Sequence, residues 1–72
     1  MIISSGIYRH YKGNNYEVIG VATHSENESQ LVVYRPLYGD QNLWVRPLEM
    51  FIEKVTVDGE SVPRFELIEA NT

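Results

Sequence analysis

Aromatic and basic residues stand next to one another at three places in this chain, and this mixture is the feature most able to do chemistry. The three places are the run Tyr8-Arg9-His10-Tyr11-Lys12, the pair Tyr34-Arg35 with Tyr38, and Trp44 with Arg46. Aromatic rings stack on flat groups, while arginine both stacks and donates paired hydrogen bonds to a carboxylate or phosphate. The pattern predicts a surface for an anionic or aromatic ligand or protein partner, such as a nucleotide, a single-stranded nucleic acid or an acidic peptide.

We predict that the binding face is drawn from these three groups. Its candidate residues are Arg9, His10, Tyr11, Tyr34, Arg35, Tyr38, Trp44 and Arg46. A second interpretation stays open for each of them, because tyrosine and tryptophan also fill the core of small β domains while arginine stems lie over them. The side of the sheet on which each ring lies decides between the two.

Enzymatic chemistry has weaker support in the sequence. A small hydrolase would use His10 or His24 with Asp40 as its acid and base groups, and this is our third hypothesis. The two histidines do not have the spacing of metal ligands, no cysteine is present, and no serine lies in a nucleophile turn. We therefore predict no catalytic residue, no metal site and no cofactor.

Length and charge restrict the partners. A length of 72 residues predicts a single domain, and the chain has a formal charge of −4. Residues 1–48 carry as many bases as acids, so the whole excess of acid lies in residues 49–72. Duplex DNA needs a net basic face and is not expected as a partner, although a local basic patch in the first two thirds is compatible with these charges.

The predicted location is the cytoplasm. No apolar run reaches the length of a membrane span, the N-terminus lacks the pattern of a signal peptide, and cysteine is absent. We expect no membrane partner. With neither a disulfide nor a structural zinc site, stability must come from apolar packing.

Turn-forming residues divide the chain into short runs rich in Tyr, Val and Ile, which is typical of an all-β domain. The predicted strands are 7–11, 16–24, 31–38, 43–46, 52–57 and 60–66. We expect a small SH3-like barrel of five to six strands, with one helical turn near 47–51, a C-terminal hairpin, a core over about 6–66 and frayed ends. Gly20 is the predicted bend, and Asp58-Gly59 predicts a type I′ turn.

Alternation along 31–38 predicts which side chains share a face. Val32, Tyr34, Pro36 and Tyr38 fall on one side, and Leu31, Val33, Arg35 and Leu37 fall on the other. Arg35 therefore lies among aliphatic side chains. We expect it to pair with an acid such as Asp40 or Glu17, or to stand at a barrel mouth.

Four motifs, taken in order, carry a family resemblance: GIYRHYKGNNYEVIGVATHSE, LVVYRPLYGD, LWVRPLEMF and VPRF. They resemble a family of short bacterial proteins known as domain of unknown function 1653, over about residues 6–66. The resemblance implies a compact β fold that stands alone or is appended to another domain, and it implies no activity. The family's recurrent pattern falls on Tyr8, His10, Tyr11, Lys12, Gly13, Tyr16, His24, Tyr34, Arg35, Tyr38, Gly39, Asp40, Trp44, Arg46, Pro47, Met50, Phe51, Pro63, Arg64 and Phe65. The turn from Glu26 to Ser29 is where this chain is least typical.

Three functional hypotheses follow from the sequence. The preferred one is a binding or adaptor module that uses the candidate face named above. The second is a structural protein that acts as a homo-oligomer through an exposed sheet edge or aromatic patch. The third is the small hydrolase, which requires its histidine and aspartate to meet in one cleft.

Overall fold

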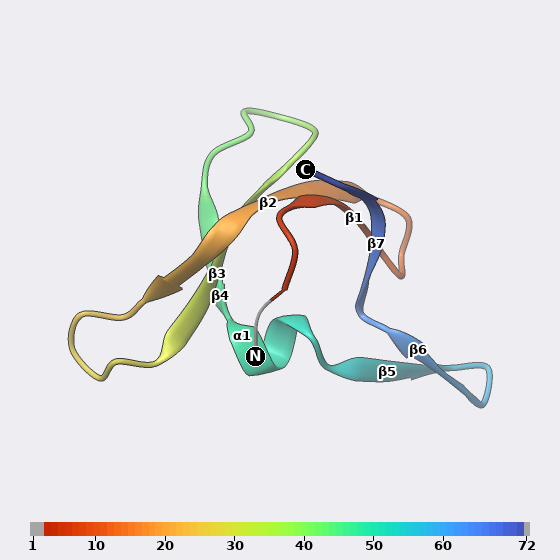
Figure 1. The fold of residues 1–72 in the computed structure, drawn as a ribbon. Helices are drawn as coiled ribbons and strands as arrows, with labels where there is room; N and C mark the ends of the chain where they lie inside the picture. The colour runs from red at the N-terminus through yellow and green to blue at the C-terminus, as the bar shows by residue number, and fades with distance from the viewer. Residues whose placement is uncertain (1–2, 72) are drawn as a thin grey trace.

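The computed structural model describes residues 3–71, whose strands form two antiparallel sheets (Figure 1). The larger sheet has the order β4-β3-β2-β1-β7 and the smaller one pairs β5 with β6. In chain order the strands are β1 (Gly6–His10), β2 (Asn15–Thr23), β3 (Gln30–Pro36), β4 (Trp44–Pro47), β5 (Lys54–Val57), β6 (Glu60–Pro63) and β7 (Phe65–Ala70). The all-β class is confirmed, with seven strands instead of five or six, and over residues 3–71 the strand pairing does not close into a barrel.

The additional strand arises at Arg64, which divides the predicted strand 60–66 in two. The amide of Arg64 donates to the carbonyl of Glu53 at 3.1 Å, while the carbonyl of Arg64 accepts from the amide of Tyr11 at 3.0 Å. One residue therefore passes the chain from the small sheet to the large one. Alternation alone cannot reveal this change of partner.

Two turn predictions are confirmed by the backbone. In the pairing of β2 with β3, Val18 lies opposite Tyr34 and Gly20 opposite Val33, so Ile19 is an extra residue that forms a β-bulge at the predicted bend. Asp58 and Gly59 both have positive φ, 50° and 82°, as a type I′ turn requires.

The helical turn is also confirmed, as α1 (Leu48–Phe51). Pro47 precedes it with φ −52° and ψ 135°, so the proline ends β4 in an extended conformation and does not occupy the first helical position. Proline is tolerated there because β4 is the edge of its sheet, where an outward amide hydrogen is not needed. Leu48 and Phe51 turn inward from this single helical turn.

Aromatic rings dominate the core. The buried side chains are Tyr8, Tyr16, Val18, Val32, Tyr34, Leu48, Phe51 and Phe65. Phe51 and Phe65 stack with their centroids 4.1 Å apart and their planes 4° apart, which ties α1 to the start of β7. The interpretation of the aromatics as core mass is thus correct for Tyr8 and Tyr34.

The buried tyrosines keep their hydroxyl groups hydrogen bonded. The hydroxyl of Tyr8 donates to the carbonyl of Ser4 at 2.7 Å, and that of Tyr34 accepts from Nε of Arg46 at 3.2 Å. The hydroxyls of Tyr16 and Tyr38 lie 3.2 Å apart. Because a buried hydroxyl needs a partner, Tyr16 and Tyr34 fix the positions of Tyr38 and Arg46.

Candidate functional site

Antiparallel pairing brings five strand ends together at one end of the large sheet. The register places Arg9 opposite Asn15, Tyr16 opposite Pro36, and Tyr34 opposite Trp44. Phe65 begins β7 and lies opposite His10, so it joins the same end. Residues far apart in the sequence therefore meet here.

Aromatic rings form a connected group at this end. His10 lies next to Tyr11, with ring centroids 4.6 Å apart, and 6.3 Å from Tyr16. Tyr16 in turn lies 6.0 Å from Tyr38 and 6.2 Å from Trp44. The residues at the two ends of this group face solvent: Tyr11 is 40% exposed, Tyr38 46% and Trp44 43%.

Cationic side chains accompany the rings. The guanidinium carbon of Arg46 lies 5.6 Å from the Phe65 ring, and Nζ of Lys12 lies 5.8 Å from the Tyr11 ring. We call this group the aromatic–basic cluster. It comprises His10, Tyr11, Lys12, Tyr16, Tyr38, Trp44, Arg46, Arg64 and Phe65.

The environment of His10 shows that the cluster is electropositive. Burial and the charges of Arg46, Arg64 and Lys12 hold the pKa of His10 below its ordinary value of 6.5, and the charges that act on it are all positive. The amide of Lys12 donates to Nδ1 of His10 at 3.1 Å. The neutral imidazole therefore carries its proton on Nε2, which is a hydrogen-bond donor.

Tyr16 stays protonated over a wide pH range. Burial, the hydrogen bond with Tyr38 and the charge of the Tyr38 hydroxyl raise the pKa of Tyr16 to about 12. Its hydroxyl is thus a neutral group that holds Tyr38 in position and supplies no negative charge to the cluster.

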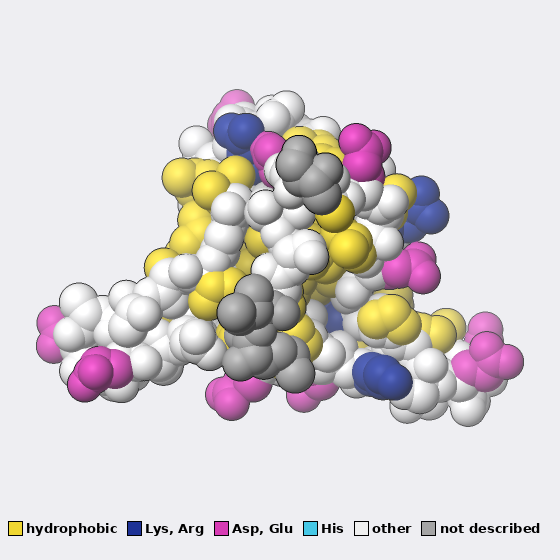
Figure 2. Space-filling model, in the orientation of Figure 1, with side chains coloured by type: hydrophobic (Ala, Val, Ile, Leu, Met, Phe, Trp, Pro, Cys, Tyr) yellow, Lys and Arg dark blue, Asp and Glu magenta, His cyan; other side chains and the backbone are white. Residues whose placement is uncertain are grey.

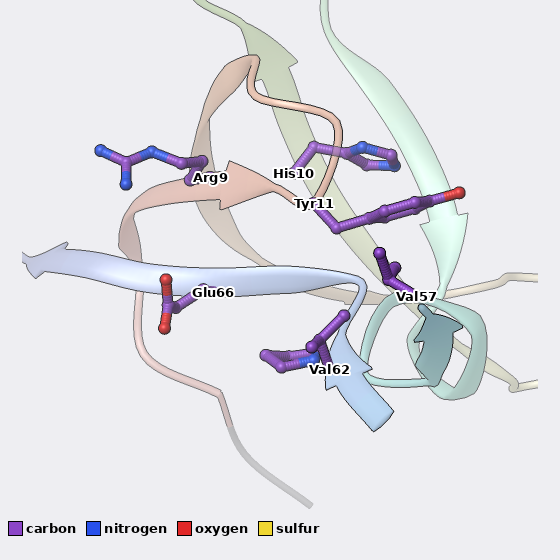
Figure 3. Close-up of a pocket in the computed structure, with 7 residues that line it drawn as sticks. Arg9, His10, Tyr11, Val57, Val62 and Glu66 are labelled. Atoms are coloured by element: carbon purple, nitrogen blue, oxygen red, sulfur yellow. The ribbon is translucent and has the colours of Figure 1, made fainter. Parts of the chain in front are cut away.

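Two cavities flank the cluster. One of about 330 Å³ lies against Arg9, His10, Tyr11, Val57, Val62, Pro63 and Glu66 (Figure 3). Figure 3 shows the His10 and Tyr11 rings side by side, with the Arg9 side chain directed away from them. The other cavity, of about 200 Å³, lies between the rings of Tyr38 and Trp44 and the loop that contains Asp40.

The predicted binding residues do not share a single face. His10, Tyr11, Tyr38, Trp44 and Arg46 come together in the cluster. Tyr34 is 3% exposed, so its ring belongs to the core and only its hydroxyl reaches Arg46. Arg35 lies on the opposite side of β3, because neighbouring side chains alternate, and Arg9 is likewise on the opposite side of β1 from His10.

Arg35 forms the ion pair that its position predicted. Its Nη2 lies 2.7 Å from Oε1 of Glu17, the residue directly opposite in β2, and its Nε donates to the same oxygen at 2.9 Å. Glu17, one of the two predicted acids, is thus the partner. This pair is a cross-strand contact on the outer side of the sheet.

Four members of the cluster were absent from the predicted face: Lys12, Tyr16, Arg64 and Phe65. Arg64 and Phe65 follow His10 by more than fifty residues, and only the pairing of β7 with β1 brings them to it. Arg64 and Phe65 are nevertheless an adjacent basic and aromatic pair, like Tyr34-Arg35, and this is the local signal that could have identified them. Lys12 ends the run Tyr8-Arg9-His10-Tyr11-Lys12, and the family pattern contains all four residues.

The residues of the hydrolase hypothesis do not meet. His10 lies against the first cavity and Asp40 against the second, while His24 accepts a hydrogen bond from the amide of Glu26 in the β2–β3 connection. Within residues 3–71 there is no group of three or more metal-binding side chains. The same residues contain no helix that is long and apolar enough to cross a bilayer.

Asp40 and Glu66 line the two cavities beside the cluster and Glu53 pairs with Arg64, whereas other acidic side chains lie at the ends of the molecule. Figure 2 shows them at both protruding ends of the molecule, which Figure 1 identifies as the β2–β3 connection and the β5–β6 hairpin. Glu26 and Glu28 belong to the first, and Asp58 and Glu60 to the second. The negative net charge is therefore compatible with a positive cluster.

Comparison with known proteins agrees with this fold. Residues 6–67 match the family described as Protein of unknown function (DUF1653). A crystal structure of a DUF1653 protein from Bordetella bronchiseptica is similar to this chain, with 33% identity and a TM-score of 0.86 over 97% of this chain and 92% of that one. No curated protein matches the chain. Since the family match extends over nearly the whole sequence, this chain belongs to the DUF1653 family.

Proposed function

We propose that this protein is a binding module whose aromatic–basic cluster receives an anionic ligand that carries a flat ring. The observation that carries the proposal is the juxtaposition of exposed rings and cations at one end of the sheet. Tyr11, Tyr38 and Trp44 are each two-fifths or more exposed, and three cations converge on His10 between them. Large rings left in water beside unneutralised charge are typical of recognition surfaces.

The cations of the cluster are available to a ligand to different degrees. Arg64 is engaged with Glu53, whose Oε1 accepts from Nη2 at 2.7 Å, so its charge is partly neutralised. Among residues 3–71, no carboxylate lies within ion-pair distance of Arg46 or Lys12. These two residues are therefore the principal anion contacts that we propose.

The proposal is tested by titrating the full chain with a mononucleotide, a single-stranded oligonucleotide and an acidic peptide while Trp44 fluorescence is recorded. Trp44 is the sole tryptophan and lies in the cluster, so it reports binding directly. We expect at least one ligand to change the Trp44 emission. The substitution Lys12→Gln should then weaken the binding of that ligand. If none of the three alters Trp44 fluorescence, the binding-module proposal is wrong.

The homo-oligomer remains a second candidate because of one feature of β4. This strand is an edge of the large sheet, and Leu43 and Val45 on or beside it are 62% and 60% exposed. An edge strand with apolar side chains is a template for pairing with another copy. Sedimentation velocity over a range of protein concentrations tests it: a dimer that Val45→Lys dissociates supports it, and a monomer at every concentration excludes it.

A further inference from the structure

We propose that the ligand of the aromatic–basic cluster is a single-stranded nucleic acid longer than one nucleotide, with bases stacked at both ends of the cluster and phosphates across its centre. This inference rests on the proposed function and names the ligand class.

The cluster has two separate stacking platforms. Tyr11 forms one, and Tyr38 with Trp44 forms the other. They are joined through the intervening rings of His10 and Tyr16, with successive centroid separations of 4.6, 6.3 and 6.2 Å from Tyr11 to Trp44. One base covers one ring, so filling both platforms requires more than one base.

Positive charge lies between and beside the platforms, where a connecting backbone would pass. The Phe65 ring has the His10 ring 5.0 Å away and the guanidinium of Arg46 5.6 Å away. Lys12 lies beside Tyr11, and Nε2–H of His10 adds a neutral donor. Alternating flat rings and cations along a groove are the general means by which single strands are held without regard to base sequence.

An acidic peptide fits this arrangement less well. Its carboxylates would engage Arg46 and Lys12 but would leave the exposed faces of Tyr11, Tyr38 and Trp44 in water. A duplex also fits less well, because its base faces are already covered by their neighbours. The acidic ends of the molecule would in addition repel a long charged rod.

The test compares a hexanucleotide of thymidine, a hexanucleotide of uridine and the corresponding mononucleotides, using the full chain and Trp44 fluorescence. We expect both oligomers to bind more tightly than the mononucleotides. With Lys12 and Arg46 facing phosphates, the logarithm of affinity should fall with the logarithm of salt concentration with a slope of about −1.4, so a fourfold rise in salt weakens binding about sevenfold. The thymidine and uridine arms separate DNA from RNA as the source.

Two variants with a matched control localise the contacts. Lys12→Gln should weaken oligonucleotide binding and reduce the salt slope by about 0.7. The control is Lys54→Gln, which removes the same charge from β5. Lys54 is not among the charges that act on His10, so its substitution should change neither the affinity for the oligonucleotide nor the salt slope. Tyr11→Leu should weaken binding of the oligomer by roughly fivefold or more, and should weaken it more than binding of the mononucleotide, because a mononucleotide fills only one platform.

The outcomes separate this inference from the proposal on which it rests. Binding of the acidic peptide alone would overturn the nucleic-acid ligand and keep the binding module, whereas no binding at all would remove both. Equal affinities for mononucleotide and hexanucleotide, or an unchanged salt slope in Lys12→Gln, would overturn the two-platform arrangement. If Tyr11→Leu does not fold, Lys12→Gln, in an exposed turn, still decides the question.

Discussion

Two ionisable side chains in the aromatic–basic cluster are held neutral by the same surroundings. Burial is the first cause for both, and it disfavours whichever form is charged. It therefore lowers the pKa of the His10 imidazole and raises that of the Tyr16 hydroxyl. The positive charge of the cluster consequently comes from Lys12, Arg46 and Arg64.

The raised pKa of Tyr16 has a consequence for stability in alkali. The folded chain holds the Tyr16 proton up to about pH 12, whereas the unfolded chain releases it near pH 10. The contribution of the Tyr16 proton to stability is therefore complete below pH 10. The free energy of unfolding should fall as the pH rises from 10 towards about 12. Urea unfolding at a series of alkaline pH values measures this fall.

Tyr16→Phe is the control for that prediction, because Tyr8 also has a raised pKa and contributes to the same fall. The variant keeps the ring and removes only the hydroxyl, so its decline should be shallower than that of the wild type. Equal declines in the two proteins would contradict the raised pKa of Tyr16.

We expect the pKa of His10 to lie below 6.5 and to respond to the cations around it. Its folded-state pKa is depressed, so its contribution to stability is complete above pH 6.5 and is lost as the pH falls towards the folded value. Lys12→Gln should raise the pKa of His10, whereas Lys54→Gln should not. Nuclear magnetic resonance titration of the imidazole protons measures both, and a pKa at or above 6.5 in the wild type would refute the prediction.

At the scale of elements, the site depends on strand ends and not on strand centres. The ends of β1 and β3 and the starts of β2, β4 and β7 meet because neighbouring strands run in opposite directions. β7 completes the arrangement by pairing with β1, and this pairing passes very close to the backbone at Gly6. The fit of β7 against β1 therefore controls whether Phe65 reaches His10.

Gly6→Ala tests that fit. Gly6 has φ 148°, and a Cβ built there would overlap the carbonyl oxygen of Glu69 in β7. We expect the substitution to lower the free energy of unfolding by about 1–3 kcal/mol, because strained backbone or a shifted strand must accommodate the methyl group. Chemical denaturation measures the change.

Gly20→Ala is the matched control within the same sheet. Among residues 3–71, apart from its two chain neighbours, no atom lies within 4 Å of a Cβ built at Gly20, and its φ is not in the left-handed region. Alanine there should leave stability unchanged or raise it by up to about 1 kcal/mol, since it restricts the unfolded chain. A loss as large as that of Gly6→Ala would show that the close approach of β7 is not the cause.

At the scale of the whole molecule, one aromatic core supports the large sheet, the helical turn and the site. Phe51 of α1 stacks on Phe65 of β7 and also packs against Tyr8 and Tyr34 from β1 and β3. Removing this ring would leave a cavity in contact with four elements. The large sheet and the cluster should therefore unfold together.

Phe51→Ala should lower the free energy of unfolding by about 3–5 kcal/mol. This is a large part of the free energy of unfolding of a typical domain, which is about 5–15 kcal/mol. Phe51→Leu fills most of the space and should cost clearly less. Urea unfolding followed by Trp44 fluorescence and by far-ultraviolet circular dichroism measures both losses. Two transitions that do not coincide would contradict a single cooperative core.

The sequence by itself determined the class of fold and most local turns. Asp58-Gly59 specifies its turn because both residues tolerate positive φ, Gly20 marks the bulge, and Pro47 separates strand from helical turn. Alternation along β3 also placed Val32 and Tyr34 on one face and Arg35 on the other, with Glu17 as one of two predicted partners, but it did not say which face is the core. These features are local, or repeat with the period of a strand, so neighbouring residues are enough to predict them.

Only the tertiary structure decided which rings and cations form a site. The rings of Tyr11, Tyr34 and Trp44 look alike in the sequence, yet one lies in the core and two face solvent. Arg64 and Phe65 reach His10 only because the chain changes sheets at Arg64 and then pairs β7 with β1. Such meetings depend on long-range pairing, which no local pattern of residue types encodes.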